Sequence, residues 1–160
     1  MTRSLAPVLN TILFTVLVPG TVAGLVPWWI AGGFHRPGSG FLTWLGILVT
    51  GVGAAIYFRC AWEFAVRGLG TPAPIAPTKF LVTTALHRYV RNPMYLGVGL
   101  VIFGEAALYR SLHVVEYGVA MLLTAHTFVV LYEEPTLRRQ FGEEYERYLR
   151  TVPRWIPRLR

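Results

Sequence analysis

Two separated stretches of the chain carry residues that together can bind a small molecule with charges of both signs. The first is Arg91-Asn92-Pro93-Met94-Tyr95, and the second begins at Glu133-Glu134. An arginine binds carboxylates, an aromatic ring stacks on flat groups or cations, and a partly desolvated glutamate attracts cations strongly. The sequence therefore predicts a binding site if the fold brings these two stretches together.

Each of these residues also has an ordinary structural interpretation. Glu133 and Glu134 precede Pro135, and acids followed by a proline are typical of the first turn of a helix. Arg91 can anchor a membrane span to anionic headgroups, and Tyr95 can belong to an interfacial aromatic belt. The sequence leaves both interpretations open.

Three further ionisable residues, Glu105, Glu116 and His126, fall inside apolar stretches. Ionisable groups at lipid depth are rare and usually functional. The two glutamates flank Arg110 and can instead be surface groups at the outer interface. His126 is expected to be either a base beside the substrate or a hydrogen-bonding group between packed helices.

The composition indicates that these residues are positioned by a membrane domain. Of the 160 residues, 54% are hydrophobic and 14% are charged, whereas soluble domains carry about a quarter charged residues. A soluble core of this size cannot bury so much apolar surface. We therefore expect a single, all-α integral membrane domain.

Four apolar segments predict about four transmembrane helices followed by a C-terminal amphipathic helix. The third segment is short for a bilayer, which needs roughly 20 residues per span. Because only Arg110 and Ser111 separate it from the fourth, these two should form an antiparallel hairpin. The predicted organisation of residues 1–160 is two N-terminal spans within 1–62, a cytoplasmic loop at 63–92, the helical hairpin at 93–132 and a cytoplasmic tail helix within 133–160. The first span contains Pro19, near which a kink is expected.

The tail has the spacing of an amphipathic helix. Leu137, Phe141, Tyr145, Tyr148 and Val152 recur every three or four residues and so share one helical face. Such a helix is expected either on the cytoplasmic membrane surface or packed under the bundle.

The basic residues predict the topology. All 15 lysines and arginines except Arg36 and Arg110 lie near the N-terminus, in or beside the loop 63–92, or in the tail. Positive residues accumulate on the cytoplasmic side, which places both termini in the cytoplasm. The net charge of +7 does not indicate a nucleic-acid partner, because the basic residues fall at segment ends rather than along one face. Since Cys60 is the single cysteine, no internal disulfide and no metal site are predicted.

The two polar stretches, in this order and on either side of a hairpin, resemble the isoprenylcysteine carboxyl methyltransferase and phospholipid methyltransferase families of membrane enzymes, most closely the bacterial members. The resemblance covers about Lys79 to Pro157, roughly half the chain. It implies an enzyme of the bacterial inner (plasma) membrane that transfers a methyl group from S-adenosylmethionine to a lipophilic acceptor in the membrane. The matching motifs are His87-Arg88-Tyr89-Val90-Arg91-Asn92-Pro93-Met94-Tyr95, Glu133-Glu134-Pro135-Thr136-Leu137 and Val152-Pro153-Arg154-Trp155-Ile156-Pro157.

The chemistry of the side chains and the resemblance together predict roles for individual residues, with the cofactor-binding set implied by the resemblance. Arg91, Glu133 and His126 are expected in catalysis. Glu133 would attract the cationic groups of the methyl donor, Arg91 would bind its carboxylate and Tyr95 would stack on it. The residues expected to bind S-adenosylmethionine are Lys79, Phe80, Leu81, Val82, His87, Asn92, Pro93, Met94, Tyr95 and Glu133.

Three positions depart from the family pattern. His87 stands where a tyrosine is common, and Asn92 stands in place of a histidine but retains hydrogen-bonding groups. Val129 occupies the position of a substrate-binding arginine in the carboxyl methyltransferases, which argues against a prenylcysteine carboxylate as the acceptor. Carboxylate, amine and thiol acceptors otherwise all suit such enzymes.

Two other functions remain open at this level. The segment Arg91–Tyr95 is also similar to the carboxy-terminal region of membrane sterol reductases, which use a nicotinamide cofactor and are generally longer. A non-catalytic membrane protein that keeps the fold is the third possibility.

Overall fold

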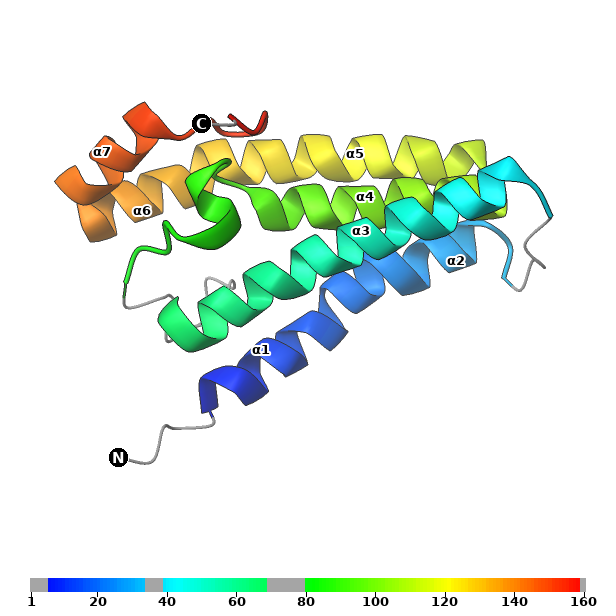
Figure 1. Ribbon diagram of the computed structural model, residues 1–160, viewed down its shortest axis with the longest axis horizontal. Coiled ribbons are helices and arrows are strands. Elements are labelled where there is room, and N and C mark those ends of the chain that lie inside the picture. Colours follow the sequence, from blue (N-terminus) through cyan, green and yellow to red (C-terminus); the bar gives the residue numbers. More distant parts are fainter. Residues whose placement is uncertain (1–5, 34–38, 69–79, 159–160) are drawn as a thin grey trace.

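The computed structural model describes residues 6–33, 39–68 and 80–158, and the regular secondary structure of this part of the chain is helical, without strands. Figure 1 shows the long helices running along one common long axis, with the short C-terminal helix lying across one end. The elements in chain order are α1 (Ala6–Leu17), η1 (Thr21–Leu25), α2 (Val26–Ile30), α3 (Phe41–Glu63), η2 (Phe64–Gly68), η3 (Ala85–Arg88), α4 (Pro93–Tyr109), α5 (Leu112–Phe128), η4 (Val129–Glu133), α6 (Glu134–Phe141) and α7 (Glu143–Thr151). The all-α fold is as predicted.

Within the described ranges, three helical stretches are long and apolar enough to cross a membrane, namely Thr11–Ile30, Phe41–Val66 and Leu112–Phe141. The apolar helix α4 has 17 residues, or about 25 Å at 1.5 Å per residue. Large apolar side chains such as Leu13 and Leu48 point outward, with 58% and 63% of their surface exposed. Exposed surface of this kind needs lipid around it, which agrees with an integral membrane protein.

The helix that contains the fourth span continues beyond the boundary that the sequence indicated. A boundary was expected at residue 133, but the helix continues through the π-helical turn η4 into α6 and ends at Phe141. Pro135 does not stop it, because it lies in the first turn of α6, where a missing N–H costs little.

The tail forms two helices rather than one. Gly142 has φ 50° and ψ −125°, a conformation open mainly to glycine, and it separates α6 from α7. The predicted apolar face is confirmed: Tyr145, Tyr148 and Val152 are buried and pack with Leu81, Leu137 and Phe141. Of the two locations expected for the tail, the structure therefore shows packing under the bundle.

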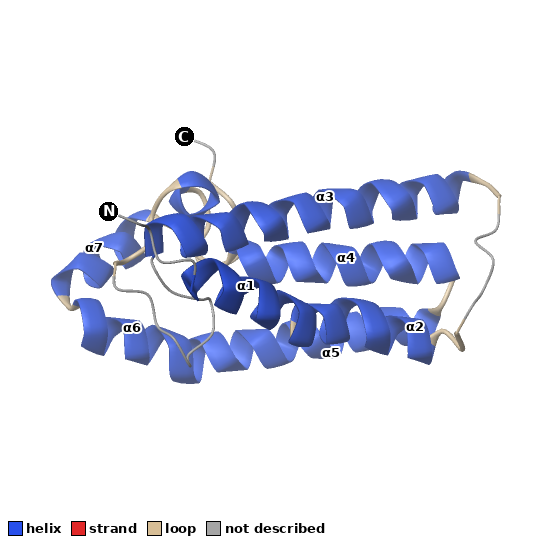
Figure 2. Ribbon diagram, turned by 90° about the horizontal axis from the view of Figure 1, so that it is seen from below, coloured by secondary structure: helices blue, strands red, loops and turns tan. Residues whose placement is uncertain are grey.

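Glycines bring α3 and α4 into backbone contact. Figure 2 shows α4 lying between α3 and α5. A Cβ atom at Gly53 would lie 2.6 Å from the carbonyl oxygen of Gly97, and one at Gly97 would lie 2.9 Å from that of Gly53. A second pair, Gly46 in α3 and Gly104 in α4, makes a similar backbone contact closer to the start of α3. Such close approach replaces hydrophobic burial as a source of helix association in lipid.

The first span is broken where the proline predicted a kink. Ala23 has non-helical angles (φ −114°, ψ 21°) between α1 and α2. Irregular backbone inside a membrane needs a partner for its freed groups, and the Tyr117 hydroxyl donates to the Val22 carbonyl at 2.8 Å. Further along, the Thr15 and Tyr57 hydroxyls share a hydrogen bond of 2.9 Å that joins α1 to α3.

One end of the bundle gathers segments that are distant in the sequence. The segment containing η3, the end of α3 and the helices α6 and α7 all lie there (Figure 1). The turn between α4 and α5, at Arg110, lies at the other end. The bundle therefore has one end that can assemble a site.

Substitution of the α3–α4 glycines tests this packing. We expect Gly53→Ala to destabilise the protein by about 1–3 kcal/mol, because the added methyl group strikes the backbone of α4. Gly51→Ala is the matched control, since a Cβ there meets nothing within 4 Å. Thermal unfolding in detergent, followed by gel filtration, measures both, and equal midpoints for the two variants would contradict the proposed contact.

Candidate functional site

A cavity of about 630 Å³ reaches from the gathered end of the bundle into its interior. This volume lies in the range of ligand-binding pockets, roughly 300–1,000 Å³. Its walls come from the first span, the end of α3, the segment 81–95, the continuous helix α5–α6 and α7. Five regions of the chain therefore form one space.

The cavity is polar at the tail end and apolar in its depth. The helix α5–α6 lines it along its length, first with Tyr117, Met121 and Ala125 and then with Glu133 and Glu134. At 1.5 Å per residue, Tyr117 and Glu133 are about 24 Å apart along the helix. Charged groups and a long apolar branch are thus combined in one cavity.

Most of the residues expected to bind a cofactor meet there. The lining includes Leu81, Val82, His87, Asn92, Pro93, Met94, Tyr95 and Glu133, together with Arg91. Phe80 is not in the lining and has 60% of its surface exposed. Lys79 lies outside the described residues. His126 is also absent from the lining.

Glu133 is the carboxylate in this cavity that has no cationic partner among the residues that the structure describes. Tyr95, in the first turn of α4, donates its hydroxyl to Glu133 Oε2 at 3.2 Å. Within the described ranges, the arginines near this end form ion pairs with Glu134 and not with Glu133. The π-helical turn η4 precedes α6, and such turns often occur at functional sites. A carboxylate with only a neutral partner can attract a cationic ligand.

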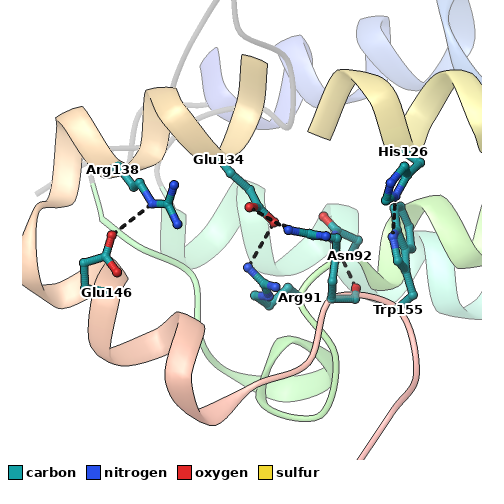
Figure 3. Close-up of polar contacts among 8 residues, drawn as sticks. Arg91, Asn92, His126, Glu134, Arg138, Glu146 and Trp155 are labelled. Atoms are coloured by element: carbon teal, nitrogen blue, oxygen red, sulfur yellow. Dashed lines mark hydrogen bonds and ion pairs between the residues drawn. The ribbon is translucent and has the colours of Figure 1, made fainter. Parts of the chain in front are cut away.

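Glu134, by contrast, is bound by two arginines. Arg154 holds it with Nε at 2.7 Å and Nη2 at 3.0 Å, and Arg91 Nη1 lies 3.0 Å away. Figure 3 shows the two guanidinium groups converging on this carboxylate from the tail and from the segment before α4. Glu134 is 5% exposed. A buried ion cluster of this kind fixes three chain segments against one another.

The tail is also tied to the segment before α4 through main-chain groups. The Asn92 side chain donates to the Arg154 carbonyl at 3.1 Å, and the Arg91 N–H donates to the Pro153 carbonyl at 2.9 Å. The Tyr148 hydroxyl donates to the His87 carbonyl at 2.7 Å. Asn92 therefore lies in the cavity wall while its side-chain amide holds the tail.

His126 packs against the tail outside the cavity. The indole N–H of Trp155 donates to His126 Nδ1 at 2.9 Å, and the two rings are 5.9 Å apart. Figure 3 shows this pair separated from the Glu134 cluster. Trp155 also meets Tyr95 edge to face at 6.4 Å. Of the two roles expected for His126, helix packing is the one that this contact supports.

His87 is a buried, neutral side chain in the cavity wall. It is 5% exposed, and its Nδ1 atom has no hydrogen-bond partner in the described part of the chain. Burial lowers the pKa of His87 to about 4, against a smaller opposite effect of Glu63. Glu63 is held by Arg59 at 2.5 Å and accepts a hydrogen bond from Thr84 at 2.9 Å, which fixes the approach to η3.

The sequence did not identify several residues of the cavity. Tyr145 and Tyr148 were assigned only to a packing face, yet both also line the cavity. Burial raises the pKa of Tyr145 to about 12, so its hydroxyl stays protonated and can donate. Arg154 belonged to a recognised motif, but the sequence predicted no role for it because no sequence spacing links it to Glu134.

Residues 41–144 match the phospholipid methyltransferase family. The matched range contains α3 to α6 and begins α7, and so includes both glutamates, Arg91 and Tyr95. No curated protein matches the sequence.

The first prediction from this geometry concerns Glu134. We expect Glu134→Gln to lower the free energy of unfolding by about 3 kcal/mol or more, because two partly buried arginines lose their counter-charge. Glu146→Gln is the control, since the Arg138–Glu146 pair is about half exposed and such pairs contribute about 0–1 kcal/mol. Unfolding in detergent and trypsin cleavage of the tail measure both variants. A Glu134→Gln protein as stable and as protease-resistant as Glu146→Gln would show that the cluster does not hold the tail.

The second prediction concerns His87 and pH. The pKa of an unperturbed histidine is 6.5, and that of folded His87 is about 4. Below pH 6.5 the unfolded chain gains a proton that the folded chain does not, so stability should fall between pH 6.5 and pH 4, by roughly 3 kcal/mol at most. His87→Phe keeps an aromatic ring against Phe64 and should remove this part of the pH dependence. Identical pH profiles for wild type and His87→Phe would rule out this origin.

Proposed function

The chain belongs to the phospholipid methyltransferase family, and from this membership and the cavity we propose that it transfers a methyl group from S-adenosylmethionine to a lipophilic acceptor in the membrane. The observation that carries the proposal is Glu133, a carboxylate in a ligand-sized cavity whose contact is a neutral tyrosine hydroxyl. S-adenosylmethionine supplies an activated methyl group on a sulfonium, and it also carries an ammonium, a carboxylate and an adenine ring.

The residues at the polar end fit these groups. Glu133 offers negative charge for the ammonium or the sulfonium. Arg91 contacts Glu134 through Nη1, and an arginine has five N–H donors, so its guanidinium can also bind a carboxylate. The Tyr95 ring offers a face for the adenine or the sulfonium.

We assign Glu133 to the ammonium rather than to the sulfonium. The sulfonium loses its charge as the methyl group leaves, so an anion beside it would stabilise the starting state more than the transition state and would slow the reaction. The ammonium keeps its charge throughout. A carboxylate bound to it contributes affinity and orientation without opposing methyl transfer.

The protein accelerates the reaction chiefly by positioning. Methyl transfer needs a nearly linear arrangement of nucleophile, carbon and sulfur, and fixing that geometry can account for a large part of the acceleration. The Glu134 cluster holds α6, the tail and the segment before α4 in one arrangement. This arrangement keeps the polar end of the cavity in a constant geometry beside its apolar branch.

The lining of the cavity bears on the chemistry of the acceptor. Val129 is 1% exposed and lines the cavity, so the position at which carboxyl methyltransferases carry a substrate-binding arginine is apolar here. This observation disfavours a prenylcysteine carboxylate and agrees with an acceptor whose reacting group is uncharged.

We further propose that the polar end of the cavity faces the cytoplasm. The segment around η3 and the tail lie at the same end of the bundle (Figure 1), and this end carries most of the basic residues. The positive-inside rule places such an end on the cytoplasmic side, where the methyl donor would be available.

Ligand titration tests the assignment of Glu133. We expect purified protein to bind S-adenosylmethionine saturably in calorimetry, and Glu133→Gln to weaken binding at least tenfold because it removes the charge but keeps the shape. S-adenosylhomocysteine lacks the sulfonium. If Glu133 binds the ammonium, Glu133→Gln should weaken the binding of this compound by the same factor. A loss confined to S-adenosylmethionine would instead place Glu133 at the sulfonium. Glu144→Gln, at an exposed position in α7, should bind as wild type does.

The same titrations separate the other functions. Binding of a reduced nicotinamide cofactor in place of S-adenosylmethionine would favour a reductase. Failure to bind either compound, with normal folding, would favour a non-catalytic membrane protein.

A further inference from the structure

Residues 153–158, here called the tail loop, follow α7 and run back along the segment before α4. Main-chain hydrogen bonds hold both ends of this loop. The carbonyl of Pro153 accepts from the segment before α4 at 2.9 Å, and the N–H of Arg158 donates to that segment at 3.1 Å. Trp155 lies between these two bonds. Its main chain is therefore fixed beside the start of α4.

The side chain of Trp155 reaches from the tail loop to α5. Its indole N–H donates to Nδ1 of His126 at 2.9 Å (Figure 3). An indole nitrogen is a donor only, so Nδ1 of His126 is the acceptor and the imidazole is neutral, with its proton on Nε2. His126 belongs to the apolar span Leu112–Phe141, where an unpaired donor or acceptor has no water to bind. The bond therefore fixes the direction of the indole ring.

A second contact joins Trp155 to Tyr95 in the first turn of α4. The two ring centroids are 6.4 Å apart and the planes are inclined by 68°, an edge-to-face arrangement within the range of attractive aromatic pairs. Tyr95 lines the cavity and donates its hydroxyl to Glu133 at 3.2 Å. In the described part of the chain, neither Trp155 nor His126 lines the cavity. Trp155 thus contacts Tyr95 from outside the cavity.

This contact bears on the orientation of the Glu133 carboxylate. Rotation about the side-chain torsions of Tyr95 would carry its hydroxyl away from Glu133. The indole of Trp155 occupies space beside the Tyr95 ring, and the bond to His126 removes the freedom of the indole itself. A continuous set of contacts therefore runs from α5 through the tail loop to the carboxylate at the end of η4.

From these contacts we propose that Trp155 is a positioning residue of the candidate site: held by His126, its ring keeps Tyr95 in the orientation that donates to Glu133. The effect on the methyl donor rests on the proposed function, whereas the orientation of Tyr95 in the ligand-free protein does not. The tail loop thereby influences the affinity of the site through a residue that does not line the cavity.

A double-variant cycle without ligand tests the orientation of Tyr95. Tyr95→Phe removes the hydroxyl that donates to Glu133 and should lower the midpoint of thermal unfolding in detergent. With His126→Phe the hydroxyl is no longer held at Glu133, so Tyr95→Phe should lower the midpoint by about half as much or less. His126→Asn offers Oδ1 in place of Nδ1 and should restore the full effect. His113→Phe is the matched control, since the His113 side chain is 79% exposed at the other end of α5, and it should leave the effect of Tyr95→Phe unchanged.

Titration with S-adenosylhomocysteine measures the consequence for the ligand. His126→Phe and Trp155→Phe should each weaken binding roughly fivefold, and the double variant no further, since both changes remove the same bond. With Glu133→Gln the loss caused by His126→Phe should fall below about twofold, because the oriented carboxylate is gone. A tail that is merely loosened would weaken binding by the same factor in both backgrounds. Trp62→Phe, at a tryptophan that is 62% exposed on α3, should bind as wild type does.

Two results would overturn the proposal. One is an equal effect of Tyr95→Phe on the unfolding midpoint with and without His126→Phe. The other is an equal loss of S-adenosylhomocysteine affinity from His126→Phe with and without Glu133→Gln. If His126→Phe does not fold, Trp155→Phe replaces it in both cycles. A wild type that binds no S-adenosylhomocysteine would count against the proposed function, while the unfolding midpoints still decide the orientation of Tyr95.

Discussion

The site depends on the binding of Glu134 by Arg91 and Arg154. A carboxylate with 5% of its surface exposed needs compensation for lost hydration, and here the two compensating cations come from segments 63 residues apart in the chain. The ion cluster acts together with the amide of Asn92, the main-chain bond to Pro153 and the packing of Tyr145, Tyr148 and Val152 on Leu81 to fix the two segments against each other. The polar end of the cavity depends on this arrangement.

The two adjacent glutamates have different environments because of local helix geometry. Glu134 begins α6 and meets the arginines, while Glu133 ends the π-helical turn η4 and meets Tyr95. Arginines neutralise the charge of Glu134, whereas the described contact of Glu133 is a neutral hydroxyl. Glu134 thus has a structural role, while the proposed function assigns ligand binding to Glu133.

Much of the fold could be predicted because its cause is local. The apolar segments, the short turn at Arg110 and the face of Tyr145 and Tyr148 follow from composition and period, and the structure confirms them. The expected end of the helix that contains the fourth span was wrong, because a proline in a first helical turn does not end a helix. The prediction of a single tail helix was wrong because the spacing of the apolar residues continues across Gly142, where the chain turns from α6 into α7.

The site was predictable only in part. The resemblance indicated Arg91, Tyr95 and Glu133, and the structure brings them to one cavity. It could not indicate that Arg91 is shared with Glu134, that Asn92 holds the tail, or that His126 faces Trp155, since these contacts depend on how distant segments dock. Likewise, the apolar residues of the first span gave no sign that they line a cavity, because lipid-facing and cavity-facing side chains are chemically alike.

The glycine contact between α3 and α4 also sets the rotational phase of α3 about its own axis. With 3.6 residues per turn, a slip of one residue would rotate the helix by about 100°. Glu63, ten residues beyond Gly53, would then turn away from Thr84, and the segment leading to His87 and Arg91 would lose its attachment to the helix. The buried glycines of the α3–α4 contact thereby determine the direction of the Glu63 carboxylate at the end of α3.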